Sequence, residues 1–276
     1  NHFGYRLVKI ILTTILSKKF LTLRLRQGCL TMIVFLLFAW IFPVYSFATP
    51  KADLLAKRLH VCTVANWMHP NLQKLITTCS EQGIELDILG MDKPYHQNTD
   101  KLRWMKDYCN RLPDDDLVLF VDAFDVLILS NKEEIVSRFL KLNVPMLMAM
   151  EMNCWPSNAT APFHPPTSSP FKYINTGGYI GWANAVKSWL RAFDESLLSC
   201  KSDQKAAHML YKKNPHFYAL DHWCQIFLCL YRLPSDALQI DALNKKVQCL
   251  YTNSSPCIFH ANGKSFEHWD RVYSFF

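Results

Sequence analysis

Several motifs that assign chains to familiar functional classes are absent from these 276 residues. No Cys-x-x-Cys pair occurs among the ten cysteines, which argues against a zinc ribbon or a thioredoxin-like site. No Gly-x-x-x-x-Gly-Lys-Ser/Thr loop is present, which argues against a kinase or an ATPase. No internal repeat is visible either. The chemistry of the chain must therefore depend on other residues.

Positive charge is scarce outside the N-terminal region, although the formal net charge of the chain is +7. Residues 1–58 hold nine Lys or Arg and a single Asp, which leaves 21 basic and 22 acidic residues in the remainder. A nucleic-acid-binding domain needs a basic surface of its own. The charge balance of residues 59–276 therefore argues against a nucleic-acid partner.

An uncharged apolar run extends from Cys29 to Ala48 and is long enough to cross a bilayer. Arg24 and Arg26 precede it, and Ser46-Phe47-Ala48 resembles a cleavage site. A buried helix of the domain is the alternative. We expect residues 1–50 to be a basic tract with a signal peptide or a membrane anchor. The domain of residues 51–276 is then exported or anchored to a membrane through its N-terminal segment.

The cysteines suit an oxidising compartment without requiring disulfide bonds. Cys62, Cys79 and Cys229 lie in apolar runs and are predicted to be small core residues. Cys249 and Cys257 flank a turn-like segment and are the candidate disulfide pair.

Apolar strand patterns alternate with amphipathic helix patterns from Leu59 onward. A capping box, Ser130-x-x-Glu133, is expected to begin one of the helices. Strands are predicted at 59–65, 84–89, 117–121 and 144–150, and helices at 69–82, 100–111, 131–140 and 182–193. This alternation predicts an α/β domain with a mostly parallel sheet and helices on both faces. A long loop rich in Pro, Ser and Thr follows at 154–169.

Two carboxylates follow the most apolar strand, Leu117–Val121. Asp122 falls where open α/β sheets bind ligands, and Asp125 is close enough to reach the same cation. Mn²⁺ or Mg²⁺ prefers such oxygen ligands, although a turn or a helix cap explains either Asp equally well. His260 ends a later apolar run and is either a turn residue or a further ligand, with Lys264 available to a diphosphate.

Two more segments allow both a structural and a functional interpretation. Gly177-Gly178 forms a bulge or tight turn, or lets the backbone approach a ligand closely. Asp203-Gln204 stands at the head of a helical pattern. Asp203 either caps that helix or presents its carboxylate to an acceptor hydroxyl, with Gln204 holding a sugar.

Six motifs occur in an order that resembles one protein family. They resemble the glycosyltransferase domain of the procollagen lysyl hydroxylases and its stand-alone relatives, from about Leu59 to Lys264. The motifs are Asp122-x-x-Asp125, Glu151-x-x-Cys154-Trp155-Pro156, Asn175-Thr176-Gly177-Gly178-Tyr179-Ile180-Gly181, Asp203-Gln204, Leu220-Asp221-His222-x-Cys224-x-Ile226-Phe227 and His260-x-Asn262-Gly263.

The resemblance implies a GT-A fold that binds UDP-glucose or UDP-galactose with Mn²⁺ or Mg²⁺ and transfers the sugar to a hydroxyl. It suggests hydroxylysine of a collagen-like protein as the acceptor. It implies Asp122, Asp125 and His260 as metal ligands, and Asp203 and Gln204 as the catalytic pair. The positions that it implies for binding the nucleotide-sugar are Val64, Asn66, Tyr95, Lys101, Ala123, Trp155, Thr176, Gly177, Gly178, Asn262, Gly263 and Lys264.

The sequence departs from the family pattern at two places. An acidic run of the family is reduced to the single Asp203, and Tyr95 replaces a tryptophan that stacks on uracil. A non-catalytic nucleotide-sugar or glycan-binding module therefore remains an alternative, as does a metal-dependent phosphohydrolase. The sequence stops at Phe276 and shows no hydroxylase domain after the glycosyltransferase-like region, so we expect a stand-alone glycosyltransferase.

Overall fold

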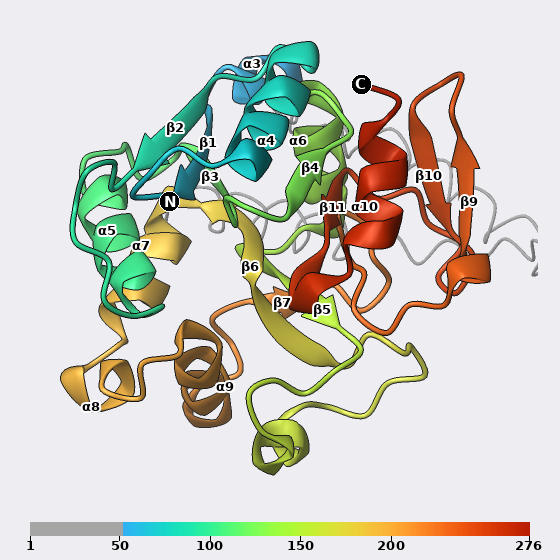
Figure 1. Cartoon of the computed structure of the whole chain (residues 1–276). Coiled ribbons are helices and arrows are strands. Elements are labelled where there is room, and N and C mark those ends of the chain that lie inside the picture. Colours follow the sequence, from blue (N-terminus) through green and yellow to red (C-terminus); the bar gives the residue numbers. More distant parts are fainter. Residues whose placement is uncertain (1–51) are drawn as a thin grey trace, which may run out of the picture. The chain divides into compact units, whose positions relative to one another are not determined.

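The computed structural model describes residues 52–276, and the predicted N-terminal tract and apolar run lie outside the described residues (Figure 1). The helices are α3 (Ala52–Ala56), α4 (Pro70–Glu81), α5 (Asp100–Cys109), α6 (Lys132–Leu142), α7 (Ala183–Arg191), α8 (Glu195–Leu198), α9 (Asp203–Lys213) and α10 (Phe266–Tyr273). Short 3-10 turns occur at Asn158–Phe163, Ser235–Ala237 and Asn262–Lys264. Within 52–276, no helix has both the length and the hydropathy to cross a membrane.

A six-stranded sheet with the order β2-β1-β3-β6-β5-β7 forms the centre of the domain. Its strands are β1 (Leu59–Val64), β2 (Leu86–Leu89), β3 (Leu117–Val121), β5 (Met146–Glu151), β6 (Tyr173–Trp182) and β7 (Ala219–Leu220). Only β6 runs antiparallel to its neighbours β3 and β5. The prediction of an α/β domain with a mostly parallel sheet is confirmed.

Alternate residues of the central strand face two separate apolar cores. Val118 and Phe120 of β3 pack with side chains of α5, α7 and α9. Leu119 and Val121 pack on the other face with α3, α4 and α6. Because successive side chains of a strand point to opposite faces, a strand buried on both sides must be apolar throughout. Figure 1 shows α4 and α6 together, apart from α5 and α7.

Two smaller sheets complete the domain. One has the order β4-β11-β8 and consists of Val126–Ile128, Ile258–His260 and Phe227–Cys229. The other pairs β9 (Leu238–Asp241) with β10 (Lys246–Cys249). Because β11 pairs with β4, the end of β11 that carries His260 lies next to the segment that follows Asp122.

Two local predictions are wrong. The side chain of Asn131, not of Ser130, caps α6, because its Oδ1 accepts the N–H of Glu134 at 3.0 Å. Cys249 and Cys257 are both buried and free, so they form no disulfide. The prediction that Cys62, Cys79 and Cys229 are core residues is confirmed, because each is at most 1% exposed.

Candidate active site

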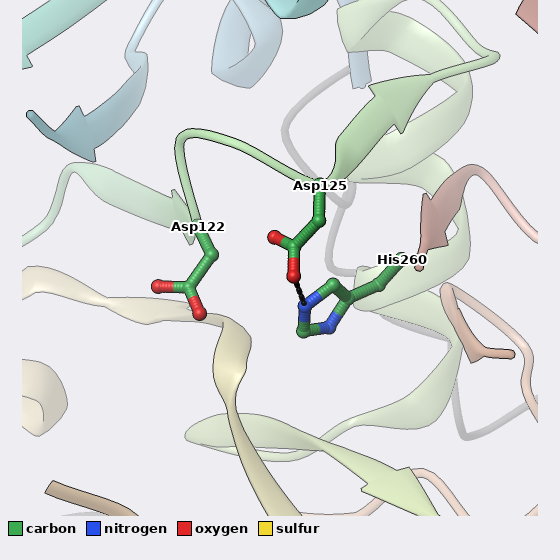
Figure 2. Close-up of side chains that lie close together, drawn as sticks. All are labelled: Asp122, Asp125 and His260. Atoms are coloured by element: carbon green, nitrogen blue, oxygen red, sulfur yellow. Dashed lines mark ion pairs between the residues drawn. The ribbon is translucent and has the colours of Figure 1, made fainter. Parts of the chain in front are cut away.

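Asp122, Asp125 and His260 lie close together at the end of the central strand (Figure 2). Asp122 follows β3, Asp125 precedes β4 and His260 ends β11. One ligand atom from each residue lies within 4.8 Å of the others. Two carboxylates and an imidazole form a donor set that suits Mn²⁺, and also Mg²⁺ with its preference for oxygen. The residues therefore fit the divalent cation that the sequence predicted.

Asp125 and His260 form an ion pair, with 3.2 Å between Oδ2 and Nε2. Burial by itself raises the pKa of Asp125 and lowers that of His260. Their mutual attraction outweighs burial, so the pKa of Asp125 is below its ordinary value and that of His260 well above it.

Gly177 leaves the space that the side chains of His260 and Asp122 occupy. A Cβ at this position would lie 2.3 Å from Cε1 of His260 and 2.8 Å from Oδ2 of Asp122. Thr176, Gly177 and Gly178 lie within β6, where the pairing with β5 shifts register between Met148 and Ala149. Gly177-Gly178 therefore lie in a strand at a bulge and not in a tight turn, and the close approach of a ligand to this backbone stays a prediction.

Lys101 of α5 bridges two carboxylates of the site. Its Nζ lies 2.8 Å from Oδ1 of Asp122 and 2.8 Å from Oδ2 of Asp203. Burial lowers the pKa of Lys101, but these two carboxylates raise it well above its ordinary value. Asp203 is 4% exposed and also accepts a hydrogen bond from Oγ1 of Thr176 at 3.0 Å. Ser202 caps α9, so Asp203 is free to face the site.

Glu151, at the end of β5, joins three separate segments of the site. Its carboxylate accepts hydrogen bonds from Asn175 at 2.9 Å, Gln204 at 2.7 Å and Asn262 at 3.0 Å. Burial raises the pKa of Glu151, and these three amide donors oppose that increase. The buried carboxylate therefore holds β6, α9 and the segment after β11 in place around the cavity.

These residues line a cavity of about 610 Å³. The predicted site residues that line it are Lys101, Asp122, Asp125, Trp155, Thr176, Asp203, Gln204, His260, Asn262, Gly263 and Lys264. Those that do not line it are Val64, Asn66, Tyr95, Ala123, Gly177 and Gly178. The structure thus brings most of the predicted residues together, and their roles remain predictions.

The predicted residues outside the cavity wall lie around it. The hydroxyl of Tyr95 donates to Oδ1 of Asn98, a lining residue, at 3.0 Å. The ring of Tyr95 packs edge-on against Trp104, with 5.9 Å between centroids. Val64 is buried at the end of β1, and Ala123 is buried two residues after the end of β3. No described contact assigns Tyr95 to a base, and the roles of Tyr95, Val64 and Ala123 stay predictions.

Trp155 is held by its backbone, and the residue as a whole is 57% exposed. Its carbonyl oxygen lies 3.3 Å from Nε2 of Gln204 and 2.9 Å from Nε2 of His208, a fully buried residue of α9. The other ring nitrogen of His208 lies 3.1 Å from Nε2 of His164. Gln204 and the two histidines therefore anchor the loop that carries Trp155 to α9.

Several lining residues had not been predicted: Asn98, Glu151, Asn153, Asn175, Tyr231 and Arg232. The sequence does contain a signal for Glu151. Glu151 ends β5, which runs parallel to β3, and Asp122 directly follows β3. Both carboxylates therefore reach the same edge of the sheet. Tyr231 and Arg232 lie in an irregular region where periodicity gives no signal.

Known proteins resemble this chain in sequence or in fold. An uncharacterized protein of Acanthamoeba polyphaga mimivirus is 25% identical over 154 residues, covering 55% of this chain and 32% of that protein. The multifunctional procollagen lysine hydroxylase and glycosyltransferase LH3 of Homo sapiens is 26% identical over 174 residues, covering 59% and 23%. The corresponding Caenorhabditis elegans protein is 26% identical over 241 residues, covering 80% and 32%. The chain thus spans about a quarter to a third of the length of these relatives.

A solved structure of a glycosyltransferase involved in glycosylation of the major capsid of PBCV-1 has the same fold. Its TM-score is 0.50 at 14% identity, and the match covers 79% of this chain and 99% of that one. A family model described as the PLOD GT domain matches residues 55–274. The chain therefore belongs to the PLOD GT domain family and is a glycosyltransferase domain with the GT-A fold.

Proposed function

We propose that the protein transfers glucose or galactose from a UDP-sugar to an acceptor hydroxyl, with hydroxylysine of a collagen-like protein as the acceptor. The observation that carries this proposal is the position of Asp122, Asp125 and His260 in the wall of the cavity that also contains Asp203 and Lys264. The similarity to procollagen lysine hydroxylase and glycosyltransferase proteins supports the acceptor.

The chain's own residues have distinct tasks in this proposal. Asp122, Asp125 and His260 would hold Mn²⁺ or Mg²⁺, which would supply positive charge to the diphosphate of the departing UDP. Lys264, which lines the same cavity, adds a further positive charge. Asp203 accepts a hydrogen bond from the acceptor hydroxyl and so aligns its oxygen for attack. Gln204, fixed by Glu151, positions the sugar.

The experiment that tests the function measures UDP release by the purified protein from UDP-glucose and UDP-galactose. Each donor is tested with Mn²⁺, with and without a hydroxylysine-containing collagen peptide. We expect peptide-dependent release that Asp125→Ala abolishes. Asp107→Ala is the matched control, because Asp107 is exposed on α5 and lies outside the cavity. Equal release without the peptide would favour the metal-dependent phosphohydrolase and contradict transfer.

A non-catalytic nucleotide-sugar or glycan-binding module is the second candidate. The contacts of Asp203 favour it, because Oδ2 already faces both Lys101 and Thr176. In this case the protein binds UDP in the presence of Mn²⁺, and no tested acceptor gives turnover. A sugar product detected on the peptide by mass spectrometry would eliminate this candidate.

We also propose that residues 1–50 direct the protein out of the cytoplasm or anchor it to a membrane. The apolar run from Cys29 to Ala48 and the preceding arginines support this proposal. A fusion of residues 1–50 to a reporter that is active only after export tests it. We expect export of the fusion, and a cytoplasmic reporter would contradict the proposal.

A further inference from the structure

A tight turn after β8 gives an arginine an unusual backbone conformation. The N–H of Leu233 donates to the carbonyl of Leu230 at 2.9 Å, which closes the four-residue turn Leu230–Leu233. Arg232, its third residue, has φ of 67°, whereas Tyr231 has no positive φ. This is the geometry of a type II turn, in which glycine is strongly preferred at the third position. An L-residue there is strained, and such strain is concentrated at functional sites.

The fold itself gains little from the side chain of Arg232. Among residues 52–276, Arg232 forms no ion pair and no side-chain hydrogen bond. Its guanidinium lies only against the ring of the neighbouring Tyr231, with 5.6 Å from Cζ to the centroid. No described contact therefore accounts for a strained arginine at a position that glycine would occupy without strain.

The turn is held rigidly against the segment that ends in Lys264. The N–H of Leu230 donates to the carbonyl of His260 at 2.9 Å, and the N–H of Tyr231 donates to Oδ1 of Asn262 at 3.0 Å. The ring of Tyr231 occupies the space beside Gly263, where an added Cβ would lie 2.6 Å from it. Arg232 is thereby placed in the cavity wall together with Gly263 and Lys264.

The cations of the cavity wall indicate which class of ligand Arg232 binds. The third cation of the wall, Lys101, is already occupied by Asp122 and Asp203. Lys264, like Arg232, forms no ion pair within the described residues. Two neighbouring unpaired cations favour an anion, and the planar guanidinium fits two phosphate oxygens at once. The donor of the proposed function brings a diphosphate into this cavity.

We propose that Arg232 is a second contact for the donor diphosphate, beside Lys264. The inference rests on the proposed function and adds a residue to its donor site. The guanidinium donates to non-bridging phosphate oxygens and, with Lys264, stabilises the charge of the departing UDP. The strained turn places this side chain in the cavity wall.

Binding of UDP and of uridine to the full chain with Mn²⁺, measured by titration calorimetry, tests the proposal. For Arg232→Gly we expect UDP affinity to fall about tenfold or more, since a hydrogen bond between charged groups is lost. Uridine affinity should stay unchanged, because uridine has no phosphate. Arg232→Lys should retain part of the UDP affinity. The melting temperature of Arg232→Gly should not fall, because glycine relieves the strain.

Lys245→Gly is the matched control. Lys245 is another basic residue with positive φ, 51°, but it pairs with Glu81 and lies outside the cavity. Its replacement should leave UDP affinity unchanged. Wild-type UDP affinity in Arg232→Gly, or an equal loss of UDP and uridine affinity, would overturn the role of Arg232 and leave the proposed function standing. Failure of the wild-type protein to bind UDP at all would overturn both.

Discussion

The ammonium group of Lys101 lies 2.8 Å from the carboxylate of Asp122, a residue that we propose as a metal ligand. The same ammonium group also neutralises Asp203. When no metal ion is bound, Lys101 is therefore the counter-charge for two carboxylates, that of the partly buried Asp122 and that of the buried Asp203. A divalent ion must share Asp122 with this lysine or displace it.

Replacement of Lys101 by methionine should make the protein more dependent on metal. In EDTA, we expect Lys101→Met to reduce the free energy of unfolding by about 3 kcal/mol, since removing one partner of a buried pair leaves uncompensated charge. Mn²⁺ should then raise the melting temperature more than it does in the wild-type protein, because the ion meets no competing ammonium group. Thermal unfolding with EDTA and with Mn²⁺ measures both effects.

Lys106→Met on the same helix is the control for this experiment. Lys106 lies outside the cavity wall, so its replacement should leave the response to Mn²⁺ unchanged. An identical Mn²⁺ response in Lys101→Met and the wild-type protein would contradict competition between the lysine and the ion.

Substitutions at two neighbouring glycines distinguish damage to the metal site from damage to the packing of the core. A Cβ at Gly177 would collide with His260 and Asp122, whereas a Cβ at Gly178 would lie 2.7 Å from the ring of Phe227. Gly177→Ala should abolish stabilisation by Mn²⁺ and reduce activity about 100-fold or more, since misplaced ligands lose the site's geometry. Gly178→Ala should lower stability by about 1–3 kcal/mol through overpacking but keep the Mn²⁺ response. Loss of that response in both variants, or in neither, would contradict this separation.

The sequence allowed most of the sheet and the two candidate metal-binding aspartates to be predicted because their signals are local, whereas His260 was assigned as a ligand through the family resemblance. Five consecutive apolar residues indicate a strand buried on both faces, and Asp122 and Asp125 follow it directly. The hydrogen bonds of Glu151 join residues that are 24, 53 and 111 positions away. No local pattern reports which amides meet there, so the organisation of the cavity could not be predicted.

Competition between neighbouring residues explains the smaller errors. Ser130 and Asn131 are both good capping residues, and the position of the first helical turn decides between them. The pair Gly177-Gly178 is equally compatible with a turn and with a strand that passes close to other side chains. Arg232 occupies a turn position that favours glycine, so the usual turn signal is missing from the sequence.

Asp203 should affect chemistry more than binding of the donor. Asp203→Asn keeps the size of the side chain and removes the charge that aligns the acceptor hydroxyl. We expect kcat to fall by about 100-fold or more, with a much smaller change in UDP affinity. Steady-state kinetics and UDP titration measure the two quantities. A fall in affinity that matches the fall in kcat/KM would indicate a role in donor binding instead.

Ser202→Ala separates that effect from damage to α9. The side chain of Ser202 caps the helix by accepting the N–H of Lys205 at 3.2 Å. Loss of the cap should reduce stability by about 1 kcal/mol and leave kcat unchanged. If Ser202→Ala lowered kcat as strongly as Asp203→Asn does, the carboxylate would not be the cause.

His208 should make the protein less stable in mild acid. Burial, with a smaller contribution from the nearby His164, lowers the pKa of His208 from 6.5 to about 4. The unfolded chain therefore binds more protons than the folded one between these two pKa values, so stability falls as the pH decreases through this range. From pH 7 to pH 5 we expect His208 to account for a loss of about 2 kcal/mol in the free energy of unfolding.

Urea unfolding at the two pH values should show a smaller loss for His208→Gln, whose amide can still donate to the Trp155 carbonyl. His216→Gln replaces an exposed histidine and should behave as the wild-type protein does. An equal loss in His208→Gln and in the wild-type protein would show that His208 is not the group that titrates.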